Sequence, residues 1–327
     1  MKVPLTFKFS DTPIEAPPTT QESEVLIITA GREPGFSQSN PSEIYPASTS
    51  CTPSLPSVRG YMGFHSATFL TSEPNPVVAS CGCADPSHLY SCKCGVLDLS
   101  TQSWEEDRMG RLTVARIRAA VARLNYVGVY VIGGLGDTKT SEFLAAGSME
   151  WQEGPALPVD MYRPCAIDIT STSYLAIYGS HILEFDAAID GPTSSKGWME
   201  ANRWPSLNAI RYYTPGCAKI GQKVIIAGGY NDDSLSSTEV LDLSTRTISM
   251  GGSMATPRYA FHLATAVISG QERLFALGGY VGAFYYGLNS AEEWVEENSS
   301  WKSADSFAVG RDRFGVVAVP RRLVCPV

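Results

Sequence analysis

Short apolar segments that end in glycine recur along the whole chain. Each holds a few aliphatic or aromatic residues, as in the Val-Ile-Ile-Ala run before Gly228. The first glycines of these segments are Gly31, Gly82, Gly133, Gly179, Gly228 and Gly278. They lie 51, 51, 46, 49 and 50 residues apart. A short apolar run bounded by glycine is typical of a buried strand. The fixed period indicates six copies of one supersecondary unit.

Two further residue types keep nearly the same period. An arginine precedes the next apolar segment at Arg59, Arg116, Arg163, Arg211, Arg258 and Arg311. A tryptophan stands shortly before the arginine in four units, as Trp104, Trp151, Trp198 and Trp301. We interpret the glycines and tryptophans as structural, because glycine suits the end of a strand and tryptophan fills space between packed sheets.

Each unit contains four strand candidates separated by turns. In the fifth unit they are Gly216–Ile220, Lys223–Ala227, Glu239–Leu243 and Arg246–Met250. No unit has a helical period long enough for a crossover, so the strands should be antiparallel and the protein all-β. Such small sheets bury their faces by stacking on their neighbours, as the blades of a propeller do.

The pattern resembles the kelch-repeat family. The matching residues are the Gly-Gly pairs at 133–134, 228–229 and 278–279, the Leu-Asp-Leu segments at 97–99 and 241–243, and the arginine and tryptophan sets. The resemblance implies a six-bladed kelch-type β-propeller of four-stranded antiparallel blades over residues 23–320. Residues 1–22 are expected to form an N-terminal tail or strap, and residues 321–327 a C-terminal tail. We expect no dimerisation domain attached to the propeller.

The two ends of the repeat region are predicted to share one blade. The chain enters at a second strand, Glu24–Thr29, with no first strand before it. Phe314–Pro320 has the pattern of a first strand, but no second strand follows it. We therefore expect this C-terminal strand to pair with Glu24–Thr29 and close the ring.

Four of the 8 cysteines lie in one predicted hairpin, at Cys81, Cys83, Cys92 and Cys94. In an antiparallel pair the residue numbers of opposed partners have a constant sum, and 81 + 94 equals 83 + 92. Disulfides Cys81–Cys94 and Cys83–Cys92 are the favoured interpretation. A zinc site and reduced structural thiols are the alternatives. Cys165 and Cys217 are interpreted as buried thiols.

Composition excludes several classes of function. The chain has 327 residues, of which 44% are hydrophobic and 18% charged, and its net charge is −8. This composition is typical of an acidic globular protein. Nucleic acid and anionic membranes are therefore not expected partners. Residues 1–10 lack the apolar core of a signal peptide, and no apolar run could span a bilayer. The glycosylation sequon at Asn298 agrees with an extracellular protein, which we favour over a cytoplasmic one.

Catalytic chemistry is not expected. The resemblance also covers copper-radical oxidases, which need two histidines and two tyrosines at one metal. The four histidines of this chain, which show no close ligand spacing, are His65, His88, His181 and His262. We find no Ser-His-Asp signature and no phosphate-binding glycine loop, so we predict a protein without catalytic residues, cofactor or metal. A propeller oxidase or carbohydrate-active enzyme remains the alternative from another class.

The resemblance implies a binding face on the loops between strands two and three and between blades. These loops are rich in tyrosine and arginine, the residue types enriched at interface hot spots. The expected partner-binding residues are Arg32, Tyr61, Asp137, Tyr162, Arg163, Arg211, Tyr212, Tyr213, Tyr230, Asn231, Arg258, Tyr259, Tyr280, Phe284, Tyr285 and Tyr286. The leading hypothesis is a secreted kelch-type protein that binds a peptide segment of another protein, with a glycan as an open further ligand. An intracellular kelch scaffold with reduced cysteines is the alternative.

Overall fold

The computed structural model describes residues 22–29, 42–46, 55–56, 66–70, 76–83, 92–105, 110–213, 215–282 and 287–325. Within these ranges the secondary structure is β-strand, with three single-turn 3-10 helices and no α-helix. The predicted all-β class is confirmed. No helix in the described ranges is long and apolar enough to cross a membrane.

Six antiparallel sheets of three or four strands make up the fold, and we number them along the chain. Sheet 1 has the order β2 (Glu43–Tyr45), β1 (Glu24–Thr29), β24 (Gly315–Pro320). Sheet 2 consists of β3 (Ser66–Leu70), β4 (Val77–Cys83), β5 (Cys92–Asp98) and β6 (Ser103–Glu105). Sheet 3 consists of β7 (Ala120–Leu124), β8 (Gly128–Ile132), β9 (Ser141–Ala145) and β10 (Trp151–Glu153).

The second half of the chain forms the other three sheets. Sheet 4 consists of β11 (Cys165–Asp168), β12 (Ser173–Tyr178) and β13 (His181–Asp186). Sheet 5 consists of β14 (Gly216–Ile220), β15 (Lys223–Ala227), β18 (Thr238–Asp242) and β19 (Thr247–Gly251). Sheet 6 consists of β20 (His262–Ile268), β21 (Gln271–Leu277), β22 (Ala291–Val295) and β23 (Ser300–Ala304). The sheet 5 strands match the sequence prediction to within one residue.

Smaller elements connect or extend these sheets. A two-residue pair, β16 (Tyr230–Asn231) and β17 (Asp233–Ser234), forms a separate ribbon. The 3-10 helices are η1 (Ser195–Gly197), η2 (Glu296–Asn298) and η3 (Arg321–Leu323). In sheet 4 the place of a fourth strand is taken by a single bridge between Trp198 and Phe185. The prediction of four strands in every unit therefore holds for sheets 2, 3, 5 and 6.

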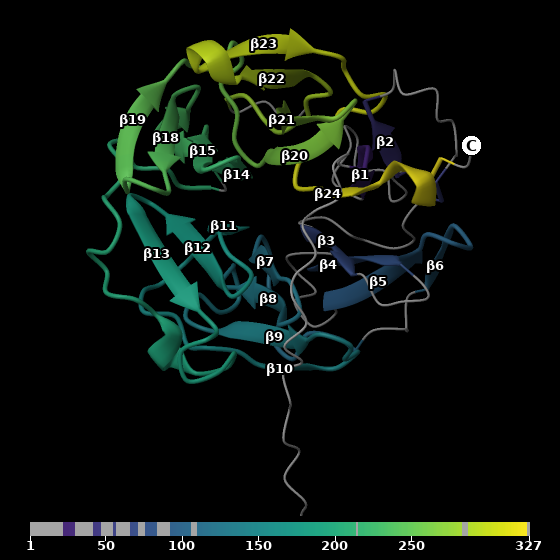
Figure 1. Ribbon diagram of the computed structural model, residues 1–327, viewed down its shortest axis with the longest axis vertical. Coiled ribbons are helices and arrows are strands. Elements are labelled where there is room, and N and C mark those ends of the chain that lie inside the picture. The colour runs from purple at the N-terminus through teal and green to yellow at the C-terminus, as the bar shows by residue number, and fades with distance from the viewer. Residues whose placement is uncertain are drawn as a thin grey trace, which may run out of the picture.

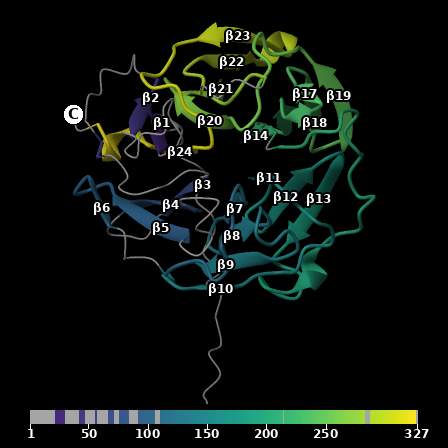
Figure 2. The same ribbon diagram turned by 180° about the vertical axis from the view of Figure 1, so that it is seen from behind.

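The sheets lie side by side around a common centre, and the strands nearest that centre are β3, β7, β11, β14, β20 and β24 (Figure 1). The view from behind shows the same order (Figure 2). Each inner strand contacts its two neighbours in the series β3, β7, β11, β14, β20, β24, and β24 in turn contacts β3. This arrangement is consistent with a kelch β-propeller.

The hydrophobic core is divided into six clusters, one between each pair of neighbouring sheets. Between sheets 3 and 4, for example, Tyr130 and Phe143 pack against Tyr174 and Phe185. The periodic tryptophans lie at the edges of these clusters, where Trp104, Trp151, Trp198 and Trp301 are partly buried. Their predicted structural role is confirmed.

Sheet 1 joins the two ends of the repeat region. Strand β24 pairs with β1 over six residues, from Glu24 opposite Pro320 to Thr29 opposite Gly315, as predicted. Residues 321–327 were expected to form a tail, but η3 follows β24 and the next two residues, Val324 and Cys325, are buried between sheets 1 and 2. The chain therefore continues to pack against the core after its last strand. The expected N-terminal tail, residues 1–22, lies outside the described residues except for Glu22.

Candidate functional site

The arginines that precede sheets 3, 5 and 6 are fully buried and belong to the framework. Arg211 places its guanidinium in sheet 5, where Nη2 lies 3.1 Å from Glu239 Oε1 and Nη1 donates to the Gly228 and Ser237 carbonyls. Corresponding pairs join Arg116 to Glu142, Arg258 to Glu292, and Arg311 of sheet 1 to Glu43. The arginine carbonyl also links neighbouring sheets, since Arg258 O accepts from the Gly229 N–H of sheet 5.

Gly228 and Gly229 have positive φ angles of 62° and 96°, and a Cβ on Gly228 would lie 2.4 Å from the Arg258 carbonyl oxygen. A side chain is therefore excluded at this contact, which explains the periodic Gly-Gly pair.

Arg163 does not occupy the place that the repeat pattern assigned to it. The Gly134 N–H donates to the carbonyl of Met161, just as Gly229 donates to Arg258 and Gly279 to Arg311. Met161 is thus the equivalent of the buried arginines in sheet 4, and Arg163 lies two residues further along. In sheet 4 the third-strand carboxylate, Glu184, pairs with Arg203 instead.

In sheets 3, 4, 5, 6 and 1 the residue two positions after Arg116, Met161, Arg211, Arg258 or Arg311 has a positive φ angle. These residues are Arg118, Arg163, Tyr213, Ala260 and Arg313. The loops around Tyr213 and Ala260 are joined by reciprocal backbone bonds between Tyr212 and Tyr230 and between Tyr259 and Tyr280. In sheets 5 and 6 these bonds hold the loop after the second strand beside the segment that enters the sheet.

The rings and guanidinium groups around these loops form a continuous series of contacts, which we call the tyrosine–arginine arc. Its members are Tyr162, Arg163, Tyr213, Tyr230, Tyr259, Tyr280 and Arg313. The Arg163 guanidinium lies 4.2 Å from the Tyr213 ring centre, and the next ring centres are 5.3 to 5.4 Å apart. At the other end the Arg313 guanidinium lies 5.1 Å from the Tyr280 ring centre.

Exposure differs along the arc. Tyr213 is 40% exposed and Tyr212 beside it 38%, whereas Tyr162, Tyr230 and Tyr259 are half-buried. Burial raises the pKa of Tyr259, although the Arg313 charge acts in the opposite direction, so the ring remains a neutral phenol. Several large amphipathic side chains therefore reach solvent from a fixed backbone.

Positive charge gathers beside the arc. Burial, and then the like charges of Arg313 and Arg163, lower the pKa of Arg118 to about 8. Asp312, which lies 3.2 Å from Arg313 Nε, acts in the opposite direction. Arg163 is only 8% exposed, and its Nε and Nη1 donate to no group in the described part of the chain. Three guanidinium groups from sheets 1, 3 and 4 thus converge beside the arc.

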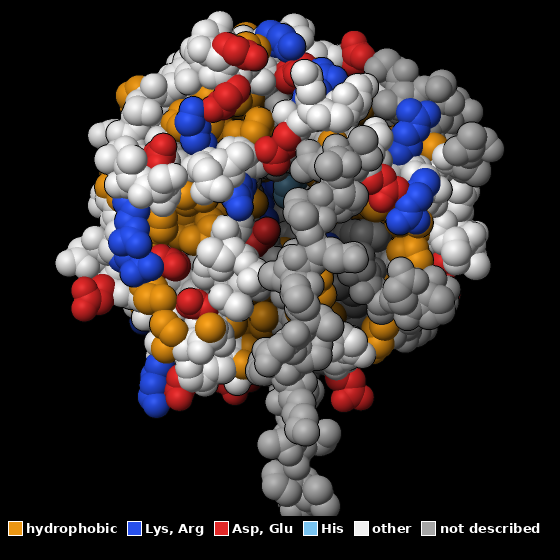
Figure 3. Space-filling view, viewed as in Figure 1, with side chains coloured by type: hydrophobic (Ala, Val, Ile, Leu, Met, Phe, Trp, Pro, Cys, Tyr) orange, Lys and Arg blue, Asp and Glu red, His pale blue; other side chains and the backbone are white. Residues whose placement is uncertain are grey.

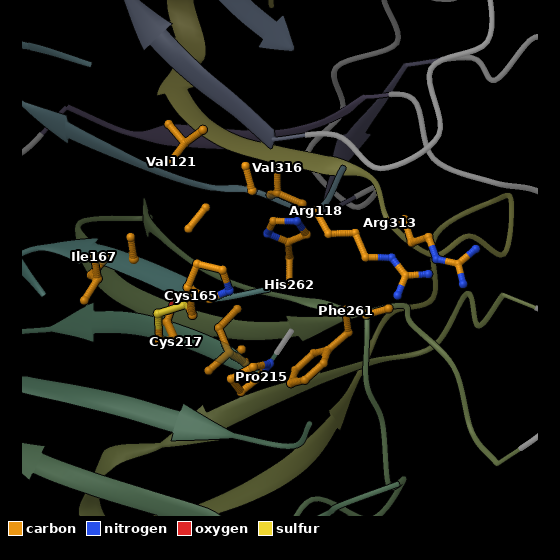
Figure 4. A pocket seen from close by; sticks show the side chains of 17 residues that line it. Arg118, Val121, Cys165, Ile167, Pro215, Cys217, Phe261, His262, Arg313 and Val316 are labelled. Carbon is orange, nitrogen blue, oxygen red and sulfur yellow. Dashed lines mark hydrogen bonds between the residues drawn. A yellow bond between two sulfur atoms is a disulfide. The ribbon is translucent and has the colours of Figure 1, made fainter. Parts of the chain in front are cut away.

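A cavity of about 170 Å³ lies at the centre of the ring below these arginines. It is lined by the inner strands of sheets 1, 3, 4, 5 and 6 and the residues just before them. Figure 4 shows the Arg118 and Arg313 guanidinium groups on one side of His262 and the Cys165–Cys217 disulfide on the other. A second, larger opening of about 730 Å³ shares several of the same wall residues, and Arg123, Asp168 and Lys219 line it.

No cluster of three or more metal-ligating side chains occurs among the residues described. His181 is exposed at the start of β13, and His262 lines the central cavity, where burial lowers its pKa to about 4. His65 and His88 lie outside the described residues. Lys, Arg, Asp and Glu side chains are interspersed on the face drawn in Figure 3, with no extended patch of one sign over its coloured residues.

The structure corrects part of the expected partner-binding set. Arg211 and Arg258 are 0% exposed and Tyr280 is 1% exposed, so they support the face from beneath rather than reach a partner. Arg163 is buried, Asp137, Tyr162, Tyr230 and Tyr259 are partly exposed, and Tyr212, Tyr213 and Asn231 are exposed. The remaining expected residues, Arg32, Tyr61, Phe284, Tyr285 and Tyr286, lie outside the described residues.

Sequence reasoning missed Arg118 and Arg313. Each follows a framework arginine by two residues, as Arg116-Ile117-Arg118 and Arg311-Asp312-Arg313. The spacing itself was a usable signal, because it repeats at the same place in two units.

The cysteines differ from expectation at one pair. Cys165 and Cys217, interpreted as buried thiols, form a disulfide between the inner strands of sheets 4 and 5, with their Cα atoms 6.0 Å apart. In the predicted hairpin the register places Cys81 opposite Cys94 and Cys83 opposite Cys92, as expected. Cys94 and Cys325 each take part in a disulfide bond, but not with each other. The assignment of Cys81–Cys94 and Cys83–Cys92 as the bonded pairs stays a prediction.

Comparison with known proteins agrees with the repeat. No curated protein matches the chain. A family model described as the Kelch motif matches residues 211–254, which begin at the buried Arg211 and include all four strands of sheet 5. The match shows one kelch motif in the chain, at sheet 5.

Proposed function

We propose that the six sheets are the blades of a closed propeller that acts as a non-enzymatic binding protein. Its proposed ligand is a peptide segment of another protein, held on the tyrosine–arginine arc. The kelch match supports a protein-interaction propeller in general terms. The observation that carries the specific proposal is the unbroken contact series from Tyr162 to Arg313 on one face.

Such an arc suits peptide recognition for physical reasons. Tyrosine offers a large apolar face and a hydroxyl at little conformational cost, because its side chain has few rotatable bonds. The ring contacts and the Arg163 guanidinium over Tyr213 hold the side chains in place before a ligand arrives. Preorganisation of this kind reduces the entropic cost of binding.

The test begins with selection of ligands from a phage-displayed library of random peptides. A selected peptide is then titrated into wild-type protein and into Tyr213→Ala and Tyr230→Ala. Alanine already occupies the position of Tyr213 in the next sheet, as Ala260 with φ 52°, so the backbone should tolerate this change. We expect each substitution to weaken binding by about 1 kcal/mol or more.

Tyr126→Ala is the matched control, because Tyr126 is 97% exposed at the tip of the β7–β8 hairpin and makes no contact with the arc. Unchanged affinity in both arc variants, or an equal loss in Tyr126→Ala, would count against the proposed face.

We also propose that the protein is secreted. The Cys165–Cys217 disulfide is typical of an oxidising compartment. The sequon residue Asn298 is exposed in η2, and the Ser300 hydroxyl donates to its Oδ1 at 2.7 Å. Intact masses of the natively purified protein, with and without reductant and after enzymatic deglycosylation, test this. Free thiols at Cys165 and Cys217 together with an unmodified Asn298 would instead favour an intracellular scaffold.

A further inference from the structure

The central cavity has an uneven distribution of polar and apolar groups. Its walls are formed by small and aliphatic side chains, among them Val121, Ala166, Ile167, Leu263 and Val316. These residues lie on β7, β11, β20 and β24, so four different sheets contribute. Apolar side chains from four sheets therefore line the cavity.

The charged groups of the cavity lie together at one end. Arg118 and Arg313 line it, and their guanidinium groups lie on the same side of His262 (Figure 4). Arg163 lies nearby. Besides burial, the charge of Arg163 lowers the pKa of Arg118, and the charge of Arg313 lowers the pKa of Arg163. Asp312 lies beside these groups, with its Oδ1 3.2 Å from Arg313 Nε.

The volume of the cavity indicates the size of ligand that it can hold. An apolar cavity of about 150 Å³ binds benzene in another protein. This one has about 170 Å³, which is room for an aromatic ring or a short aliphatic chain. Arginine is the residue that best matches a carboxylate, because its planar fork forms two parallel hydrogen bonds.

We propose that the central cavity is a binding site for a small amphiphilic carboxylic acid. The carboxylate would lie against Arg118 and Arg313, and an aromatic or short aliphatic body would extend between Val121, Ile167 and Leu263. The two proposed sites share Arg313, but the cavity site does not rest on the proposed peptide-binding function, because Tyr213 and Tyr230 do not line the cavity.

A ligand series tests the proposal without any protein partner. Benzoate, hexanoate, acetate, benzyl alcohol and inorganic phosphate are titrated separately into wild-type protein, with heteronuclear NMR as the readout. We expect benzoate or hexanoate to bind with a dissociation constant on the order of 1 mM or tighter. Acetate lacks the apolar body and benzyl alcohol lacks the charge, so each should bind at least about tenfold more weakly.

Three variants locate the site. Arg118→Gln should weaken benzoate binding by about tenfold, because one charge-assisted contact is lost. Ala166→Leu should also weaken it, because the added side chain fills the cavity. Arg123→Gln is the matched control, since Arg123 lies near the end of β7 and lines the second opening, not the cavity beside Arg118. Circular dichroism and thermal melting check that each variant is folded.

Three results would overturn the proposal. Equal binding of acetate, phosphate and benzoate would show that only the positive charge is recognised. Binding of benzoate that survives both Arg118→Gln and Ala166→Leu, or no binding of benzoate and hexanoate at all, would show that the cavity is not the site. None of these results bears on peptide binding at Tyr213 and Tyr230, so the two proposals fail separately.

Discussion

At the residue scale, the buried arginines show how this fold tolerates charge in its interior. Arg211 and Glu239 are both fully buried, yet each has several partners. Backbone and side-chain amides of Asn208 and Ala209 donate to the Glu239 carboxylate, and backbone carbonyls accept from the Arg211 guanidinium. Such a pair is costly to break, because removing one member leaves a buried charge without its counter-ion.

Substitution of Arg211 by methionine tests this account. Met161 fills the corresponding position in sheet 4, so the side chain should fit. We expect Arg211→Met to lower the free energy of unfolding by about 3–5 kcal/mol, because Glu239 stays buried without its partner. Urea unfolding measures the change. Arg211→Met with Glu239→Gln should recover part of the loss, and Arg111→Met, at an exposed position, should cost little.

His262 gives the protein a predictable response to acid. Its folded-state pKa of about 4, lowered chiefly by burial, lies below the ordinary value of 6.5. Between these pH values the unfolded chain binds a proton that the folded chain does not, so the free energy of unfolding falls as pH decreases from 6.5 to 4.

The measurement is the difference in unfolding free energy between wild type and His262→Phe across this range. Wild type should lose on the order of 3 kcal/mol relative to the variant, and the difference should level off below pH 4. His181→Gln, which changes an exposed histidine, should retain the wild-type profile. Parallel profiles for wild type and His262→Phe would contradict this assignment.

At the scale of elements, strand positions could be predicted best where the same residue types recur in every unit. The bounds of β14 and β15 and the pairing of β24 with β1 agree with prediction, because apolar periodicity and glycine positions determine them locally. The period alone misassigned Arg163. An arginine two residues away from the framework position keeps nearly the same period, and only the backbone bond to Met161 separates the two.

Contacts between sheets were harder to predict. Cys165 and Cys217 lie on different sheets, with a sequence separation of 52, and no local pattern brings their side chains together. The burial of Arg211, Arg258 and Tyr280 has the same origin, because exposure depends on how neighbouring sheets and loops pack. The arc could be predicted only in composition, as a face rich in tyrosine and arginine.

The Cys165–Cys217 disulfide should stabilise the junction between sheets 4 and 5. In the chain-entropy model, a cross-link that closes a segment of this separation contributes about 4 kcal/mol. We expect Cys165→Ala with Cys217→Ala to lower the free energy of unfolding by about that amount in urea. Cys165→Val with Cys217→Val restores apolar volume without the bond, and it should lose a similar amount. Full recovery with valine would mean that packing, not the cross-link, stabilises this junction.

At the scale of the whole molecule, stability depends on every interface between sheets. One core cluster lies between each pair of neighbouring sheets, so each of the six sheets packs against both of its neighbours. Two of these clusters include residues from the C-terminal segment, such as Phe314 and Val319. The same segment supplies the inner strand of sheet 1 and thereby joins residues that are nearly the full chain length apart.

Deletion of residues 312–327 should therefore destabilise the molecule as a whole rather than only its last strand. The deletion exposes the backbone edge of β1 and removes side chains from both clusters that flank sheet 1. We expect a loss of at least about 5 kcal/mol, a large part of the stability of a typical domain. Thermal melting followed by circular dichroism gives the comparison. A synthetic peptide of residues 312–327 should raise the melting temperature of the truncated chain, and a scrambled peptide should not. If the truncated chain melts like the full chain, sheet 1 does not hold the ring together, and the closure would be a local feature of its two strands.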